Sequence, residues 1–381
     1  MDEERPGTAS ESGKRWRAIN YGSAQWINNG TGGPDYQSGI PTRTYQWRYR
    51  APRCEQISSL KIVLPNLSCP NGQGEVPGAN PIGVKAAIVH ADQLIPMRFG
   101  GVASTTIPPG ELAESDELEH FIPADAHYGI RVCVSVGAGE AWPVGPVFAG
   151  PLEQGSADGD LTTGGSIVPA DGCGYCPAAV LVKTARKTIG GIGDSIMHGW
   201  GDAFSVDADG NVGWFSRLIL NRCGQLKMPA SGSRADQFSL DGRIMDLLDC
   251  SDVIIEGFGR NDISAGYSAS KVLSDRMAIW RAIRARYPDK KLLAATVVPI
   301  TMDNTAPAEP LADVRNELND SLSHVGDIID GVIDFCPAIE TAPGSNVFRQ
   351  GMSGEGGDWT HLAPKGYAAA AEYLDLQAIL R

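Results

Sequence analysis

The stretch TIGGIGDSIMHG, residues 188–199, joins a short apolar run to a polar turn. Residues 188–193 have the composition of a short buried strand, and Asp194 and Ser195 follow directly after it. A second run, DVIIEGFG at residues 252–259, is almost continuously apolar, as is typical of a strand that is covered on both faces of a parallel sheet. These two runs predict that the second half of the chain contains a parallel sheet.

Helical patterns alternate with these strands. Residues 271–286 carry an apolar stripe at spacings of four, three and three residues, which predicts a helix that ends before Pro288. Further helices are expected at residues 214–221, 238–248, 311–325 and 363–379, and further strands at 225–228, 290–300 and 331–335. Strands that alternate with helices predict a doubly wound α/β fold with right-handed crossovers.

The first half of the chain has a different pattern. It offers short β-prone runs and almost no helical periodicity, with strands expected at residues 44–49, 59–64, 84–89 and 130–136. Clusters such as NNGTGGPD separate these runs, which favours an antiparallel β sandwich or jelly roll. Residues 150–174 are rich in Gly and Asp and are expected to form a long connecting loop. We therefore expect a β-rich domain at 1–185 and an α/β domain at 186–381.

The composition argues against several classes of partner. The chain has 381 residues and a net charge of −13, without a basic tail or stripe. Binding to nucleic acid or to an anionic membrane surface is therefore not expected, because both need concentrated Lys and Arg. No apolar run approaches the length of a membrane span, and the polar first residues lack the pattern of a secretion signal. These patterns leave open retention in the cell, export by another route, or a trimmed signal, and they do not indicate an oligomeric state.

The cysteines do not indicate a disulfide scaffold, because there are only eight in the whole chain. Cys173 and Cys176 alone have the spacing of a pair. One such pair without a second is poor support for zinc, and a loop disulfide or two thiols are the better interpretations.

Polar residues follow the predicted strands where ligands bind in open α/β sheets, at the carboxyl ends. Asp194 and Ser195 follow the first strand, ASGS at 230–233 follows the second, and GRND at 259–262 follows the third, while DWTH at 358–361 precedes the last helix. Taken singly, each motif can be an ordinary turn or helix cap. Together they supply a hydroxyl, an amide, a carboxylate and an imidazole, which are the groups that acyl transfer needs.

With these motifs, the second half of the chain resembles the SGNH (GDSL-type) serine hydrolase family. Gly193-Asp194-Ser195 with Gly199 matches the opening motif, except that Ile196 replaces its usual Leu. The Gly-x-Asn-Asp and Asp-x-x-His motifs are complete. The single Gly of the second motif is placed at Gly232, since Gly224 precedes its strand. The resemblance implies a flavodoxin-like parallel sheet.

The resemblance also implies roles for individual residues. Ser195 would be the nucleophile, His361 the general base, and Asp358 the acid that orients the imidazole. The backbone N–H groups of Ser195 and Gly232 and the side-chain amide of Asn261 would form the oxyanion hole. No metal or organic cofactor is required by this mechanism. Asp194 and Asp262 are expected to brace the loops, while His198, Trp200, Trp359 and Arg260 are candidates for the pocket wall, with packing or ion pairing as the ordinary alternative.

A β-rich front half joined to such a hydrolase resembles some microbial carbohydrate esterases. The expected substrate is then a small-molecule or polysaccharide ester, above all an O-acetylated sugar, although this is an analogy of fold alone. Aromatic residues could stack on sugar rings if they are exposed, the candidates being Trp26, Tyr36, Trp47 and Trp142, although core packing is the more frequent role of Trp. A lipase or thioesterase is the alternative enzyme, and an inactive carbohydrate-binding or structural module is the alternative outside catalysis. The pattern shows no apolar lid helix, which favours acetyl esters.

Overall fold

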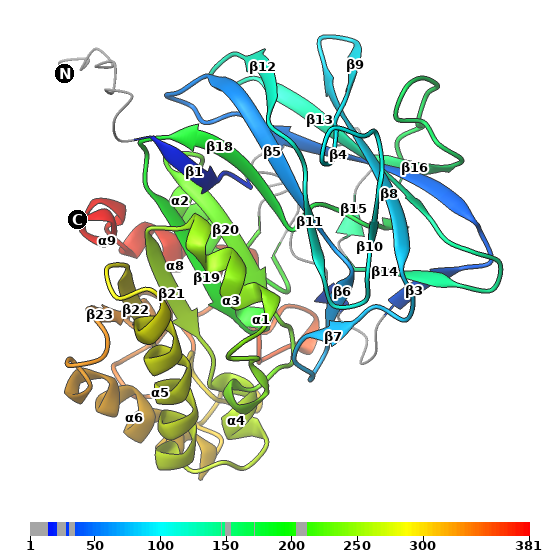
Figure 1. Ribbon diagram of the computed structural model, residues 1–381. Helices are drawn as coiled ribbons and strands as arrows, with labels where there is room; N and C mark the ends of the chain where they lie inside the picture. Colours follow the sequence, from blue (N-terminus) through cyan, green and yellow to red (C-terminus); the bar gives the residue numbers. More distant parts are fainter. Residues whose placement is uncertain are drawn as a thin grey trace.

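The computed structural model describes residues 14–20, 28–29, 35–145, 147–148, 154–170, 172–202 and 212–381. Figure 1 shows a β-rich half and an α/β half side by side. Among the described residues, no helix combines the length and the apolar character that crossing a membrane requires.

The α/β half is built on one parallel sheet. Its strands lie in the order β20-β19-β21-β22-β23, and every adjacent pair is parallel. Their bounds are β19 (Thr188–Gly193), β20 (Gly224–Pro229), β21 (Val253–Gly257), β22 (Lys291–Ala295) and β23 (Gly331–Ile333). The strand predicted at 290–300 is shorter than expected, because residue 297 has left the sheet and its N–H is held by Asn319 Oδ1 at 2.9 Å.

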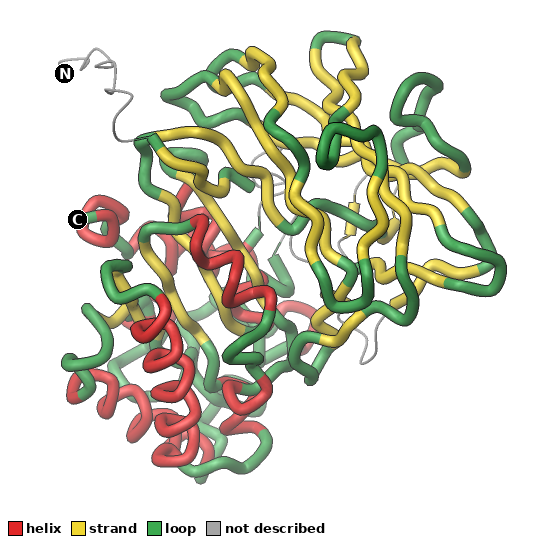
Figure 2. Tube along the Cα trace, viewed as in Figure 1, coloured by secondary structure: helices red, strands yellow, loops and turns green. Residues whose placement is uncertain are grey.

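Helices cover both faces of this sheet (Figure 2). Ile254 and Leu292 face the apolar side of α5, whereas Ile255 and Leu293 face α2 and α8. The helices are α1 (Ser195–His198), α2 (Gly213–Ile219), α3 (Arg243–Leu247), α4 (Arg260–Ser264), α5 (Ala269–Arg286), α6 (Leu311–Ser321), α7 (Cys336–Ile339), α8 (Pro364–Tyr373) and α9 (Leu376–Leu380), with short 3-10 helices at Ala235–Gln237, Leu248–Cys250, Leu322–His324 and Glu355–Gly357.

Two predicted helices differ from the observed ones. Residues 238–242 are not helical, because Gly242 takes an extended conformation and begins α3 as its N-cap. The predicted terminal helix at 363–379 is two helices, since the chain is extended at Leu374 and Asp375. The Asp375 side chain caps α9 by accepting the Gln377 N–H at 2.9 Å.

The β-rich half contains two larger antiparallel sheets, as the sequence predicts. The first is β1-β18-β5-β11 with β12 on β5, and the second is β10-β8-β13-β4-β16 with β9 on β8. The bounds are β1 (Arg15–Ala18), β4 (Thr42–Arg50), β5 (Ile57–Pro65), β8 (Ile82–His90), β9 (Gln93–Pro96), β10 (Thr105–Ile107), β11 (Leu112–Glu114), β12 (Leu118–Ile122), β13 (His127–Ser135), β16 (Gly155–Asp158) and β18 (Ala179–Thr184). Residues of both sheets form one hydrophobic cluster.

Short strands complete this half: β2 (Asn28–Asn29), β3 (Asp35–Ser38), β6 (Leu67–Pro70), β7 (Val76–Pro77), β14 (Ala141–Val144), β15 (Val147–Phe148) and β17 (Gly172–Cys173). The predicted loop at 150–174 is therefore wrong in part, because β16 is an edge strand on β4 and β17 pairs with β15; residues 150–153 and 171 lie outside the described residues. In the predicted Cys pair, Cys173 is exposed and Cys176 is buried.

Two of the four aromatic residues proposed for sugar stacking lie in the core, not at the surface. Trp47 and Trp142 are completely buried, and each indole N–H donates a hydrogen bond inside the protein, to Tyr175 O and Tyr45 Oη respectively. Trp26 lies outside the described residues, as does the side chain of Tyr36. Core packing therefore accounts for both described tryptophans.

The two halves share a hydrophobic cluster. Val63, Leu67 and Leu181 of the β-rich half pack in the same cluster as Leu226 and Met228 of β20. Polar contacts flank it, since Arg17 pairs with Asp252 at 2.8 Å and Gln225 Nε2 donates to Asn20 O at 3.1 Å. The halves are thus joined by a dry, packed surface as well as by the chain.

A buried ion pair lies beneath the third motif. Glu256 on β21 and Arg276 on α5 have no exposed side-chain surface, and their nearest N and O atoms are 2.9 Å apart. The same carboxylate accepts the Trp280 indole N–H at 2.8 Å and the Phe258 N–H at 2.6 Å. Because a buried charge is tolerated only when it is paired and hydrogen-bonded, this pair fixes the chain just before Gly259.

Candidate active site

The structure brings Ser195, His361 and Asp358 into one hydrogen-bonded series. Ser195 is the first residue of α1, directly after β19, whereas His361 lies in the turn that leads into α8. His361 Nε2 lies 2.8 Å from Ser195 Oγ, and His361 Nδ1 lies 2.7 Å from Asp358 Oδ2. Ser195 is only 7% exposed. A hydroxyl, an imidazole and a carboxylate are therefore arranged as a nucleophile, a base and an orienting acid.

Asp358 is held in its ionised form. Burial raises the pKa of this carboxyl, but hydrogen bonds from the His361 ring and the Thr360 N–H outweigh burial, so the pKa lies below its usual value. The His361 backbone N–H adds a third bond at 3.2 Å. An ionised carboxylate on Nδ1 leaves Nε2 as the acceptor toward Ser195, which is the tautomer that a general base needs.

The turn that carries Ser195 is stabilised by its neighbours. Asp194 is the N-cap of α1, and its side chain accepts the Ile196 N–H at 2.9 Å. Burial raises the pKa of Asp194 to about 7. Gly199 ends α1 with φ of 91°, and a Cβ there would lie 2.4 Å from Gly213 N, so only glycine fits this position.

A loop at residues 231–233 follows β20 and lies beside the Ser195 turn. Ala230 N donates to Gly193 O at 2.7 Å, which joins the ends of β20 and β19. Asn261 Nδ2 donates to Ser233 O at 3.1 Å and lies 3.4 Å from Asp194 Oδ2, a weak contact. Among the described residues, no backbone carbonyl accepts the N–H of Ser195 or of Gly232. Hydrogen bonds therefore join the segments that carry the three groups predicted for the oxyanion hole, and two of these groups have no backbone acceptor in the described part of the chain.

One residue near the site, Lys227, was not predicted from the sequence, and it bonds to the backbone of His198, a candidate for the pocket wall. His198 Nδ1 lies 3.0 Å from Ser231 Oγ, and the buried Lys227 Nζ donates to His198 O at 2.5 Å and to Val212 O at 2.7 Å. Burial lowers the pKa of Lys227 to about 7 and that of His198 to about 3, so His198 is a neutral imidazole. The sequence does contain a signal, because Lys227 places a charged side chain between Leu226 and Met228 in a predicted strand.

The other pocket candidates separate into exposed and packed residues. Trp200 is 47% exposed, and its ring centroid lies 6.4 Å from that of His361. The Tyr367 hydroxyl fixes its backbone by donating to Trp200 O at 2.9 Å. Trp359 packs its ring against Gly354. Trp200 therefore offers an exposed aromatic side chain that a ligand beside the imidazole can meet.

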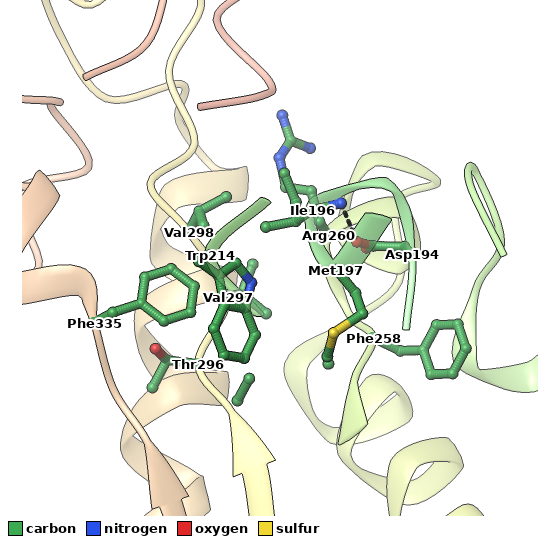
Figure 3. A pocket seen from close by; sticks show the side chains of 12 residues that line it. Asp194, Ile196, Met197, Trp214, Phe258, Arg260, Thr296, Val297, Val298 and Phe335 are labelled. Carbon is green, nitrogen blue, oxygen red and sulfur yellow. Dashed lines mark hydrogen bonds between the residues drawn. The ribbon is translucent and has the colours of Figure 1, made fainter. Parts of the chain in front are cut away.

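Arg260 borders a small cavity beneath α1 (Figure 3). The cavity has a volume of about 20 Å³, and the rings of Trp214 and Phe335 and the thioether of Met197 surround it. The Arg260 guanidinium extends away from these apolar groups and bonds Ser264 Oγ. Arg260 is 8% exposed, and burial lowers its pKa. The space suffices for about one water molecule.

Asp262 gives the site a pH-dependent contribution to stability. Its Oδ1 accepts the Ala235 N–H at 3.0 Å, while the buried Oδ2 has no partner among the described residues, and burial raises the pKa to about 6. The folded protein thus binds this proton more tightly than the unfolded chain does, and stability falls as pH rises from about 4 to 6.

Asp262→Asn removes this titration. Between pH 4 and pH 8 the natural protein should lose up to about 3 kcal/mol of unfolding free energy that the variant keeps. The Tm of the variant should therefore rise relative to that of the natural protein as the pH increases. Thermal unfolding at both pH values measures it, with the exposed Asp327→Asn as the control. A difference that is the same at both pH values would contradict this interpretation of Asp262.

One family model matches part of the chain. Residues 192–369 match the model of the GDSL-like lipase/acylhydrolase family, and this segment contains Ser195, Gly232, Asn261, Asp358 and His361. No curated protein matches the chain.

Solved structures that resemble the chain include three of low sequence identity. A carbohydrate esterase family 2 enzyme with a carbohydrate-binding domain from Corynascus thermopiles (Myceliophthora fergusii) shares 14% identity over 96% of this chain and 98% of its own, with a TM-score of 0.37. A member of the lipolytic G-D-S-L family from Veillonella parvula shares 18% identity over 49% of this chain and 94% of its own, with a TM-score of 0.37. The lipase Lip_vut3 from a goat rumen metagenome shares 16% identity over 51% of this chain and 97% of its own, also with a TM-score of 0.37.

The family assignment rests on the match to the family model. Residues 192–369 of this chain belong to the GDSL-like lipase/acylhydrolase family, so this segment is an ester hydrolase domain.

Proposed function

We propose that this chain is a serine esterase that hydrolyses short acyl esters, above all acetyl esters of carbohydrates, through an acyl-enzyme intermediate. The hydrogen-bonded series Ser195–His361–Asp358 is the observation that carries the proposal. The strand order β20-β19-β21-β22-β23 supports a flavodoxin-like doubly wound sheet, in which the carboxyl ends of the strands hold the ligand. In this proposal residues 186–381 are the hydrolase domain and residues 1–185 are a β-rich module that interacts with the carbohydrate.

The first half of the reaction forms the acyl-enzyme. His361 Nε2 takes the proton of Ser195 Oγ as the oxygen attacks the carbonyl carbon. Asp358 stabilises the imidazolium that forms. The oxyanion of the tetrahedral intermediate accepts hydrogen bonds from the N–H groups of Ser195 and Gly232 and from the Asn261 amide. Collapse of the intermediate breaks the C–O bond to the alcohol, which leaves with the proton from His361.

The second half of the reaction repeats this chemistry with water. His361 takes a proton from water as the water oxygen attacks the acyl carbon on Ser195 Oγ. The second tetrahedral intermediate uses the same donors, and its collapse returns the proton to Ser195 and releases the acid. The whole cycle needs one imidazole that alternates between base and acid.

The alcohol must leave beside His361, which protonates it, and Trp200 lies there. An exposed indole next to the imidazole offers a flat apolar face, on which the C–H face of a sugar ring can pack. This arrangement supports a ring alcohol as the leaving group. Because Trp47 and Trp142 are buried, the carbohydrate part of the proposal depends on Trp200.

Two cavities border these loops, and neither is lined by Ser195 or His361. The cavity beside Ile196 measures about 20 Å³, and one between Ala230 and Phe258 measures about 10 Å³. Pockets for larger ligands measure roughly 300–1,000 Å³, so neither cavity can receive a long acyl chain.

Substrate profiling of the natural protein tests the proposal. We expect acetate release from acetylated xylan or pectin, and among p-nitrophenyl esters a rate that falls as the chain grows from acetyl to decanoyl. Preference for decanoyl would instead indicate a lipase. If no ester is turned over and a fluorophosphonate does not label Ser195, the chain is a binding or structural module.

Trp200→Ala tests the leaving-group side separately. We expect kcat/KM for an acetylated xylo-oligosaccharide to fall about tenfold, the equivalent of 1.4 kcal/mol, because the ring loses its packing surface. Ethyl acetate, whose alcohol is too small to cover the indole, should be hydrolysed at the natural rate. Trp200→Phe should retain most of the activity on the sugar ester. Equal losses on both substrates would contradict a role in binding the sugar.

A further inference from the structure

A segment of the β-rich half reaches the 231–233 loop. Residues 71–75 connect β6 to β7, and Figure 1 places these two strands at the end of the β-rich half that lies near α1. Gly72 N donates to Ser231 O at 3.2 Å, and Ser233 Oγ donates to Gln73 O at 2.6 Å. The loop that follows β20 is therefore bonded to a segment about 160 residues away in the chain.

The bond from Gly72 acts on one particular peptide group. Ser231 O and Gly232 N belong to the same peptide unit, which is planar, so the direction of its C=O determines the direction of its N–H. Gly72 holds the carbonyl end, and in a trans peptide the N–H end then points the opposite way. This is the N–H that the proposed reaction uses for the oxyanion.

Asn71 restrains the same peptide from the side. Gly232 has φ of 71°, and a Cβ built on it would lie 1.5 Å from Asn71 Oδ1. The Asn71 side chain thus fills the space that any larger residue at position 232 would need, and it packs directly on the Gly232 backbone. A side chain of the β-rich half sets the shape of this loop.

The 71–75 segment is itself firmly attached to the α/β half. Gln237 Nε2 donates to Gly72 O at 2.6 Å. The Glu75 carboxylate accepts the N–H groups of Arg243 and Ile244 at 2.7 and 2.8 Å, and so caps the first turn of α3. A segment bonded at both of its ends can hold a loop in one position.

We infer that Asn71 is a positioning residue for ester hydrolysis, and that the 71–75 segment of the β-rich half orients the Gly232 N–H toward the oxyanion. The inference rests on the proposed function. The β-rich half is then part of the catalytic machinery as well as a substrate-binding module, because it orients a donor that acts in the transition state.

Two substitutions at position 71 separate positioning from packing. Asn71→Ala removes the contact, and we expect kcat for p-nitrophenyl acetate to fall about tenfold with KM unchanged. The loss should be smaller than the 10²- to 10³-fold that follows deletion of a whole donor. Asn71→Asp keeps the shape but places a negative charge beside the developing oxyanion, and its kcat should fall at least as far. A purely structural role predicts that Asn71→Asp keeps the natural kcat.

The control is Asn80→Ala, another asparagine of the β-rich half, whose Oδ1 accepts the Ala141 N–H. It should keep the natural kcat, and thermal unfolding should show all variants folded. If both Asn71 variants fail to fold, Ser233→Ala, which removes the bond to Gln73, serves instead and should lower kcat with KM unchanged.

Each outcome gives a decision. A folded Asn71→Asp protein that keeps kcat within twofold, or a Ser233→Ala protein that does so, would overturn the inference while the proposed function stands. A natural protein that turns over no ester and leaves Ser195 unlabelled would overturn both.

Discussion

Ser195→Ala is expected to lower kcat for acetyl ester hydrolysis by roughly 10⁵- to 10⁶-fold, because the acyl-enzyme can no longer form. The fold should persist, since alanine suits the first turn of α1 and Asp194 still caps it. Acetate release measures the rate, and thermal unfolding confirms the fold. The residual rate should match what the oxyanion donors and binding alone can give.

Three comparisons make this result interpretable. His361→Ala should lose activity to a similar extent, because serine and base act as a unit. Ser251 is a buried serine just before β21, at the amino ends of the strands, whereas Ser195 lies at the carboxyl ends. Ser251→Ala should therefore keep the natural kcat. A fluorophosphonate should label the natural protein but not the Ser195 variant. An active, folded Ser195→Ala protein would remove the basis of the proposed mechanism.

Asn261→Ala should reduce kcat by roughly 10²- to 10³-fold while KM changes little, because the amide is proposed to act on charge that develops only in the transition state. In the absence of substrate, the Asn261 amide donates to Ser233 O at 3.1 Å, and its other contact within the described part of the chain is the long one to Asp194 Oδ2 at 3.4 Å. The weakly bonded N–H can turn to a substrate oxygen at little cost.

Two measurements check the role of Asn261. Steady-state kinetics separates kcat from KM, and thermal unfolding reports whether the lost bond to Ser233 O loosens the fold. A matched control is Asn316→Ala, which removes a partly buried amide bonded to Gly344 O, on α6. A kcat within threefold of the natural value for Asn261→Ala would show that the amide contributes little to the transition state.

The sequence allowed much of the α/β half and the Ser195–His361 contact to be predicted. Residues 188–193 are followed at once by Asp194 and Ser195, and such strand-to-helix turns bring polar side chains to one edge of a parallel sheet. The helix predicted at 238–248 was too long, because Gly242 takes an extended backbone conformation and the helix begins only after it.

Other features depend on contacts between distant segments, which periodicity does not report. Glu256 is a charged residue within an apolar strand, and only the structure shows that Arg276 lies beside it and pairs with it. Lys227 is likewise explained only by the carbonyl oxygens of His198 and Val212. Asn71 lies in a turn-rich stretch of the β-rich half, and nothing in that stretch indicates that it touches Gly232.

The hydrophobic cluster shared by the two halves has a consequence for biosynthesis. Val63, Leu67 and Leu181 leave the ribosome before Leu226 and Met228, their partners in the cluster, have been translated. Until the later strands arrive, the nascent chain exposes an apolar surface, which favours chaperone binding or aggregation. Burial of this surface therefore requires that the chain has been made at least as far as β20.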